Sequence, residues 1–348
     1  MNFKDKNFEL VEIENLRGHT DKVRRVAWNP AAGVAGVPAM IASCGADKTV
    51  RIWEQNPTTG SFQCKQELER KHTSTVQQCF WSVTGKLLAT STVDGDTCVW
   101  ESVGETFQHA DDFEHPLKLP SNVYWNASGL LLVTCAVQKT IWIWKISSYT
   151  EMEAPSLLLT DTEDVKMVQW HPSLDILFSV GCDNTIKVWV SNSGSWTCLQ
   201  TLGERDSKLK HTFQALAFNS SADKIVACSD DLTIMIWGAD SEMMLNGEKN
   251  ALWTHLCTLS GYHDKAIFSV HWSSEGIICS GAADGALCLF VENEDRSVDE
   301  PKYRLLLKKE NTHDSNVNSV QWCTTEKRRL ASASDDGTVK IWELASLP

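Results

Sequence analysis

Histidine, serine or threonine, aspartate and tryptophan recur in a fixed order along this chain. The sequence contains three complete sets, namely His19–Ser43–Asp47–Trp53, His72–Thr90–Asp94–Trp100 and His313–Ser332–Asp336–Trp342. Side chains of these types can catalyse a reaction, or they can form a hydrogen-bonded chain that fixes a hairpin. Because buried polar groups are costly unless every partner is present, such a chain holds a repeated unit together. The repetition favours this second interpretation, and we predict structural braces with no reactive role.

The chain also contains twelve cysteines, which could bind a metal ion. They form no Cys-x-x-Cys pair and no ligand run of the iron–sulfur type. Instead Cys44, Cys135 and Cys228 each lie three residues before the aspartate position, and Cys64 and Cys198 share a second equivalent position. Recurrence at equal positions indicates equal packing, because free cysteine is among the most buried residue types. The sequence therefore predicts no metal site and no cofactor.

Motifs for catalysis are missing as well. The Gly85-Lys86 pair lacks the upstream glycine and the following serine or threonine of a phosphate-binding loop. No Gly-x-Ser-x-Gly, His-Glu-x-x-His or paired-carboxylate pattern is present. We predict a protein that is not an enzyme; an enzyme would need a cluster of titratable residues at the centre of the fold.

The spacing of six residues between aspartate and tryptophan defines a repeat. Gln138 before Trp144 and Asp284 before Phe290 are imperfect copies, so seven units close near residues 53, 100, 144, 189, 237, 290 and 342. WD40 blades are about 40–45 residues long. We predict an all-β fold, a seven-bladed WD40 β-propeller that uses residues 1–348 as one domain.

The two ends of the chain are expected to meet in the last blade. Residues 8–13 alternate between apolar and polar types, which is typical of a half-buried strand. Only six residues follow Trp342, so residues 8–13 are predicted to supply the outer strand of blade seven and to remove an open sheet edge. Residues 238–251 and 292–302 are expected to be surface loops inserted after blades five and six.

Composition restricts the possible partners and the location. The net charge of −13 argues against non-specific binding to nucleic acid, which needs a basic face. No run of eighteen apolar residues and no signal-peptide pattern is present, so we expect no membrane span and a cytoplasmic or nuclear protein with reduced cysteines.

Recognition is then expected on the face where the loops before the first strands gather. Residues six and four positions before the first-strand aromatic are predicted to point there. With one hairpin lysine, the candidate partner-binding residues are Lys22, Arg24, Gln77, Lys139, Lys166, Gln214, Phe268 and Asn318. Phe268 is either an anchor worth about 2 kcal/mol or more, or a residue packed under a neighbouring loop. Lys22, Arg24 and Lys166 form either a positive patch or ordinary solvated charges.

Several segments together resemble one WD40 family. They are the aromatic-x-Cys sequences at residues 62–64 and 196–198, CTLSGYH at 257–263, DVKMVQWHP at 164–172 and ACSDD at 227–231. With seven blades and two late insertions, the whole chain resembles the cytosolic iron–sulfur protein assembly WD40 proteins, the Ciao family. It departs from them at Val137, where the family has an arginine and only Lys139 keeps a nearby positive charge. A Leu-Tyr-Arg triplet of the animal members is replaced by residues 188–190.

The resemblance implies a non-catalytic scaffold of the complex that delivers iron–sulfur clusters to cytosolic and nuclear apoproteins. It also implies two partners, a HEAT-repeat adaptor and a small cysteine-bearing subunit, with this chain as a monomer within the hetero-complex. The alternative is a WD40 substrate receptor or scaffold of another assembly, such as a ubiquitin ligase or a chromatin complex.

Overall fold

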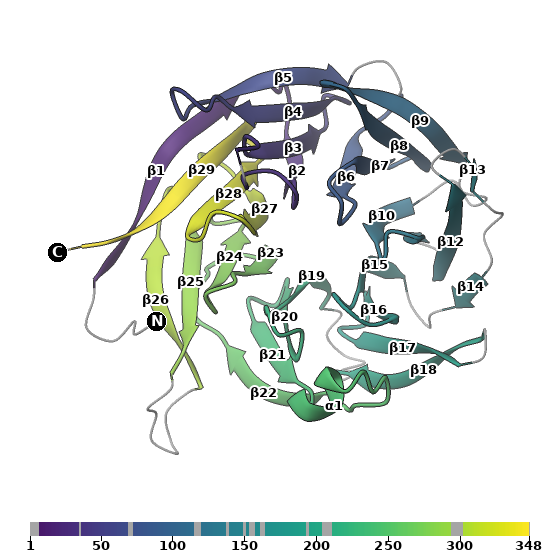
Figure 1. Ribbon diagram of the computed structural model, residues 1–348. Helices are drawn as coiled ribbons and strands as arrows, with labels where there is room; N and C mark the ends of the chain where they lie inside the picture. The colour runs from purple at the N-terminus through teal and green to yellow at the C-terminus, as the bar shows by residue number, and fades with distance from the viewer. Residues whose placement is uncertain are drawn as a thin grey trace.

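Seven antiparallel sheets stand around a central axis in the computed structural model (Figure 1). The structure describes residues 7–34, 36–68, 72–114, 120–136, 139–148, 151–152, 157–160, 164–192, 195–203, 211–293 and 302–347. In blades one to six the first strand of each sheet lies nearest the axis and later strands lie progressively outward. The predicted seven-bladed propeller is confirmed.

The first three blades use the following strands. Blade one contains β2 (Val23–Trp28), β3 (Met40–Gly45), β4 (Val50–Gln55) and β5 (Phe62–Leu68). Blade two contains β6 (Val76–Trp81), β7 (Leu87–Thr92), β8 (Asp96–Val103) and β9 (Thr106–Glu114). Blade three is irregular and contains β10 (Pro120–Trp125), β11 (Leu131–Ala136), β12 (Thr140–Ser148), β13 (Glu151–Met152) and β14 (Leu157–Thr160).

The remaining blades are regular four-stranded sheets. Blade four contains β15 (Val165–Trp170), β16 (Ile176–Gly181), β17 (Ile186–Asn192) and β18 (Ser195–Leu202). Blade five contains β19 (Phe213–Phe218), β20 (Lys224–Ser229), β21 (Ile234–Gly238) and β22 (Thr254–Leu259). Blade six contains β23 (Ile267–Trp272), β24 (Ile278–Ala282), β25 (Leu287–Glu292) and β26 (Tyr303–Lys309). Blade seven contains β27 (Val317–Trp322), β28 (Arg329–Ser334), β29 (Thr338–Ser346) and β1 (Phe8–Arg17).

The N-terminal strand closes the ring. β1 pairs antiparallel with β29 from Phe8 opposite Ser346 to Arg17 opposite Thr338, so it extends beyond the predicted residues 8–13. Figure 1 shows β1 beside β29 at the outer rim of the last blade. Leu10 and Leu16 on this strand are buried. Closure therefore covers the edge of β29 and adds apolar packing at once.

Each first strand contains a β-bulge at the same place. Its pairing with the second strand skips the residue four positions before the closing aromatic of that strand. The skipped residues are Arg24, Gln77, Ser121, Lys166, Gln214, Phe268 and Asn318. A bulge re-aims side chains at the rim of a sheet. Six of the eight predicted partner-binding residues are thus the unpaired residue of a bulge.

Glutamine side chains join the outer strands of neighbouring blades. Gln66 on β5 donates from Nε2 to the carbonyl of Phe107 on β9 (2.8 Å) and accepts from the Phe107 amide (2.8 Å). Gln200 on β18 makes the same pair of hydrogen bonds with Trp253 just before β22 (2.8 and 2.9 Å). These bonds satisfy backbone groups where one outer strand begins against the next.

The insertion predicted after blade five lies within that blade, between β21 and β22, and it is more apolar than predicted. It contains the helix α1 (Ser241–Leu245), whose first amides donate to the carboxylate of Asp240. Met244, Ala251 and Trp253 are buried, and the Trp253 ring packs edge-on against Phe178 with centroids 5.3 Å apart. The second predicted insertion lies largely outside the described residues, as do Val137 and Gln138. Among the described residues no helix has the length and hydropathy to cross a membrane.

Candidate partner-binding face

Two complete braces hold blades one and seven. In blade one, His19 Nδ1 lies 2.8 Å from Asp47 Oδ2 and His19 Nε2 lies 2.7 Å from Ser43 Oγ. Trp53 Nε1 donates to the same Ser43 oxygen at 2.8 Å. Because a carboxylate only accepts, Nδ1 carries the proton and Nε2 accepts from the serine hydroxyl. In blade seven the matching distances among His313, Asp336, Ser332 and Trp342 are 2.8, 2.7 and 2.8 Å.

Blade six contains a brace that the sequence interpretation missed. His263 Nδ1 lies 2.9 Å from Asp284 Oδ2, and His263 Nε2 lies 2.8 Å from Ser280 Oγ. Phe290 occupies the position of the tryptophan, so no indole N–H donates to Ser280 Oγ and the set lacks the fourth residue type of the repeat. The spacing from His263 to Trp272, the same nine residues as in the other braces, was the signal that could have found it.

The predicted brace of blade two is wrong at its aspartate. His72 Nε2 lies 3.0 Å from Thr90 Oγ1, to which Trp100 Nε1 also donates at 3.0 Å. Asp94 instead accepts from the hydroxyls of neighbouring threonine and serine residues, among them Thr92 Oγ1 at 2.6 Å. In blades one, six and seven the backbone amide two residues after the aspartate donates to the carboxylate, which also faces the histidine. In blade two the corresponding amide, that of Asp96, donates to Thr92 Oγ1 instead.

Ionisation of the brace aspartates follows from this geometry. Burial opposes the charge on Asp47, but hydrogen bonds and attraction from His19, with further backbone donors, outweigh it and lower the pKa of Asp47 to about 2. Asp284 beside His263 also has a pKa of about 2 for the same reasons. The pKa of Asp336 is also lowered: burial opposes its charge, but hydrogen bonds from His313 and Thr338 outweigh this effect. These groups are therefore fixed anions within the fold.

We call the loop face the surface made by the segments before the first strands and by the hairpins between second and third strands. The braces tie these two sets of loops together. Between blades one and seven, the Asp335 carboxylate lies 3.3 Å from Lys22 Nζ and 3.4 Å from Arg24 Nη1. It also accepts hydrogen bonds from the amides of Asn316 (3.1 Å) and Asn318 (2.8 Å). Lys22, Arg24 and Asn318 are thus brought together around one anion.

The other candidates occupy separate places on the ring. Lys166 is exposed on β15 of blade four, and Lys139 is exposed in the β11–β12 hairpin of blade three with a positive φ of 65°. Gln77 and Phe268 are half-buried, and Gln214 is half-buried and donates to the carbonyl of Thr212 (3.5 Å). The structure therefore gathers three candidates around Asp335 and leaves the others spread over blades two to six.

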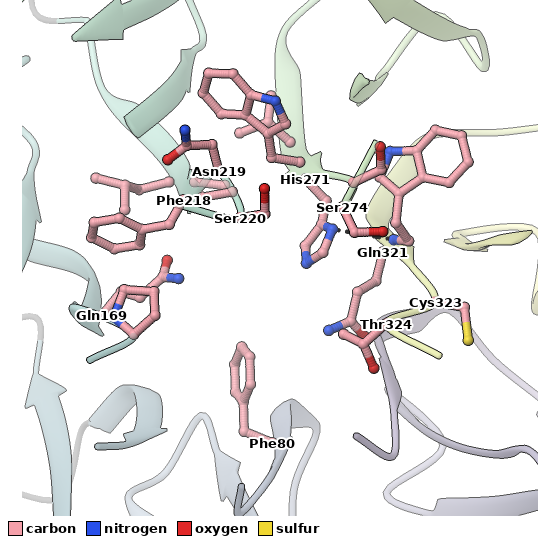
Figure 2. Close-up of a pocket in the computed structure, with 18 of the residues that line it drawn as sticks. Phe80, Gln169, Phe218, Asn219, Ser220, His271, Ser274, Gln321, Cys323 and Thr324 are labelled. Atoms are coloured by element: carbon pink, nitrogen blue, oxygen red, sulfur yellow. Dashed lines mark hydrogen bonds between the residues drawn. The ribbon is translucent and has the colours of Figure 1, made fainter. Parts of the chain in front are cut away.

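The opposite end of the central channel contains a cavity of about 270 Å³ that the sequence interpretation did not select. Figure 2 shows Phe80, Gln169, His271 and Gln321, from four different blades, around this opening. Each of these residues directly precedes the aromatic residue that ends the first strand of its blade. Polar residues at this inward-facing position could have indicated the cavity from the sequence.

Apolar and polar side chains both line this cavity, and among the lining residues Arg25 is the one that carries a fixed charge. Burial, with a smaller contribution from Arg25, lowers the pKa of His271 to about 3, and burial raises the pKa of Tyr124. The guanidinium of Arg25 lies 4.7 Å from the centre of the Phe80 ring. None of the residues lining this cavity is Asp or Glu.

Comparison with known proteins agrees with the fold. A family model described as WD domain, G-beta repeat matches residues 10–54, 62–101, 156–190, 196–238 and 305–343. The chain is a WD40-repeat β-propeller, and hydrogen-bonded braces hold the loops on one of its faces.

Similarity to individual proteins extends over the whole length. The chain is 51% identical to Protein CIA1 of Arabidopsis thaliana over 352 residues, which cover 100% of both chains. It is 33% identical to the probable cytosolic iron-sulfur protein assembly protein CIAO1 homolog of Chlamydomonas reinhardtii, over 97% of this chain and 99% of that protein. Identity to the probable Ciao1 protein of Culex quinquefasciatus is 32%, over 96% and 98%. The chain belongs to this Ciao family of WD40 proteins.

Proposed function

We propose that this protein acts in cytosolic iron–sulfur protein assembly as a non-catalytic scaffold that helps to deliver clusters to cytosolic and nuclear apoproteins. The observation that carries the proposal is the 51% identity to Protein CIA1 across the full length of both chains, together with relatives named for cytosolic iron–sulfur protein assembly. A cytosolic location, with access to the nucleus, follows from this role.

The side chains support a scaffold more than an enzyme. The histidines that could act as bases in blades one, six and seven are hydrogen-bonded within their braces. The channel cavity offers His271 and Tyr124 but no lining carboxylate with which to form an acid–base pair. Recognition then depends on surfaces, because function on a repeated fold resides in the sites grafted onto it.

The loop face is the surface we assign to the partners, a HEAT-repeat adaptor and a small cysteine-bearing subunit. Lys22 is 48% exposed beside Asp335, and Lys166 is exposed on another blade. On a chain with net charge −13, exposed cations on one face favour partners with acidic surfaces there.

Charge reversal on one face at a time tests this assignment. The Lys22→Glu/Lys166→Glu double variant changes the loop face, and Lys86→Glu/Lys327→Glu makes the same charge change on exposed lysines of the opposite loops. Each full-length variant is used as bait in native cytosolic extract and in cells depleted of the wild-type protein. We expect the loop-face variant to lose the adaptor and small subunit at least tenfold, and the control to retain both.

Activity of a cytosolic iron–sulfur enzyme in the depleted cells provides the functional readout. It should fall on depletion and recover with the wild-type chain and with the control variant. Unchanged enzyme activity after depletion would instead favour the alternative function, a receptor or scaffold of a ubiquitin ligase or chromatin complex. The replacement of the family arginine by Val137 is the observation that favours this alternative.

A further inference from the structure

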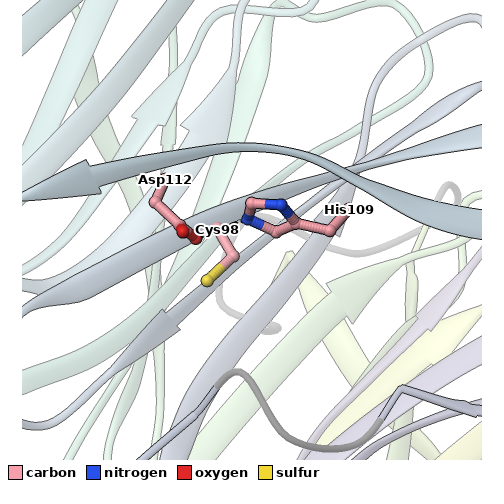
Figure 3. Close-up of side chains that lie close together, drawn as sticks. All are labelled: Cys98, His109 and Asp112. Carbon is pink, nitrogen blue, oxygen red and sulfur yellow. Dashed lines mark hydrogen bonds and ion pairs between the residues drawn. The ribbon is translucent and has the colours of Figure 1, made fainter.

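The β8–β9 hairpin of blade two brings three metal-binding residue types together (Figure 3). Cys98 on β8 lies opposite Asp112 on β9, and Trp100 lies opposite His109. The register shifts between these pairs, so that one extra residue of β9 separates His109 from Asp112. Because of this bulge, two residues three positions apart point to the same face of the strand.

The ligand atoms of Cys98, His109 and Asp112 all lie within 4.8 Å of one another. His109 Nε2 lies 2.6 Å from Asp112 Oδ1. The Cys98 side chain is buried, that of His109 is half-buried and that of Asp112 is exposed. A cation could therefore reach the cluster from solvent while its thiol ligand stays protected inside the blade.

A second histidine faces the same thiol from the inner side. His72 Nδ1 lies 3.8 Å from Cys98 Sγ. Thr90 Oγ1 donates to the carbonyl of Cys98 (3.4 Å), so it accepts from the other ring nitrogen of His72, Nε2. The protonated nitrogen is then Nε2, and the lone pair on Nδ1 points towards the sulfur.

Three other blades place a cation at the position of Cys98, two residues before the closing tryptophan, and in two of them the cation pairs with an acidic residue of the outer strand. In blade one this residue is Arg51, which forms an ion pair with Glu67 on the outer strand. In blade seven it is Lys340, whose Nζ lies 2.9 Å from Glu12 on β1. Blade two keeps an acidic partner, Asp112, but has a cysteine at that position. A metal ion bound beside Cys98 would give blade two the pairing of a positive with a negative charge that blades one and seven have at this position.

We propose that Cys98, His109 and Asp112 form a binding site for a divalent transition metal of the zinc class. His72 is not part of this group and lies beside the thiol on its inner side. Nitrogen, sulfur and carboxylate donors are those that Zn²⁺ takes in tetrahedral sites, at about 2.0–2.3 Å from the metal. Two ligands at such distances lie roughly 3.3–3.6 Å apart in a tetrahedron, so His109 Nε2 and Asp112 Oδ1, which are 2.6 Å apart, would separate slightly around a bound ion. On binding, the Cys98 thiol releases its proton to solvent and its thiolate joins the metal. The site does not depend on the proposed role in iron–sulfur protein assembly.

Zinc titration of the reduced full-length protein, in competition with a chromophoric chelator, tests the site. We expect one equivalent of Zn²⁺ to bind, and His109→Gln and Asp112→Asn each to weaken the affinity about 10- to 100-fold. His255→Gln is the matched control. His255 occupies the place opposite the closing tryptophan of blade five, but there Thr258 replaces the aspartate. This variant should bind zinc as tightly as the wild type.

Substitution with Co²⁺ reports on the thiol. The sulfur-to-cobalt absorption band should be present in the wild type and lost in Cys98→Ser, whereas Cys288→Ser changes the equivalent residue of blade six and should retain it. If Cys98→Ser fails to fold, the surface variant His109→Gln decides the question. The proposal is overturned if no zinc binds, if His109→Gln binds like the wild type, or if zinc binding disappears only when the exposed Cys64 and Cys198 are changed to serine.

Discussion

Competing hydrogen-bond donors decide whether a brace aspartate reaches its histidine. Thr49 and Thr338 donate to Asp47 and Asp336, and both carboxylates also face a histidine. In blade two the corresponding residue is Asp96, and Asp94 points instead to surface hydroxyls. The same four residue types at the same spacing can therefore form two different networks.

Substitution of the two aspartates should separate these networks. Asp336→Asn weakens a charged hydrogen bond to the buried His313, so we expect the free energy of unfolding to fall by about 1–3 kcal/mol. Asp94→Asn changes two exposed hydrogen bonds and a part-buried one from Thr92, none of them to a histidine, and should cost less, about 0.5–1 kcal/mol. Urea denaturation of both variants provides the measurement. Equal losses would show that Asp94 contributes to the blade as a brace residue after all.

Spacing alone identified the braces but not every hydrogen bond in them. The nine-residue and six-residue intervals predicted His19, His313 and their partners, because strand length and hairpin type fix these positions. The rotation of Asp94 depends on competing hydroxyls and could not be read from the interval. The grouping of Lys22 and Asn318 around Asp335 joins blades from opposite ends of the chain, which no local pattern encodes.

At the scale of the strand, β1 closes the ring by pairing with β29 in the last blade. Leu10 is fully buried in the cluster of blades six and seven, whereas its neighbour Val11 is 39% exposed. Leu10→Ala should lower the free energy of unfolding by about 2–5 kcal/mol, because it removes buried methyl groups and leaves a cavity. Val11→Ala should change it by less than about 0.5 kcal/mol. Thermal and urea unfolding of the pair measure the difference, and a small loss in Leu10→Ala would contradict closure through this strand.

The insertion between β21 and β22 shows where sequence reasoning was insufficient. Its polar residues and glycines suggested a surface loop over residues 238–251, yet Ala251 is buried and Trp253, two residues further on, is 2% exposed between blades four and five. Alternation of apolar residues reveals strands, because their period is two residues. A short capped helix followed by one anchoring aromatic has no such period, so its packing could not be predicted.

Trp253 and its neighbour provide a second matched pair. Trp253→Ala should cost about 3–5 kcal/mol, because the ring packs against Phe178 and Phe218 and would leave a large cavity. Leu252→Ala changes a side chain that is 59% exposed and should be nearly neutral. Unfolding transitions in urea test both. Similar stability of the two variants would mean that the insertion is not anchored to the blades.

For the molecule as a whole, the buried histidines make stability depend on pH. Burial lowers the pKa of His271 to about 3 and that of His72 to about 4, against an ordinary value near 6.5. Between these values the unfolded chain binds protons that the folded protein does not. Stability from these groups is therefore complete above about pH 6.5 and is lost as the pH falls towards 4, with a slope of at most about 1.4 kcal/mol per pH unit for each histidine.

Replacing His271 should flatten this dependence. Gln at this position can still accept the hydrogen bond that the Trp322 amide gives to Nδ1 (3.2 Å), but it takes up no proton in either state. Free energies of unfolding measured from pH 7 to pH 4.5 should therefore decline less steeply for His271→Gln than for the wild type. The exposed His255→Gln variant should keep the wild-type slope. If the free energy of unfolding falls with the same slope in all three proteins, His271 takes up a proton in the folded protein as readily as in the unfolded chain. The channel would then be positively charged at low pH and would repel cationic ligands.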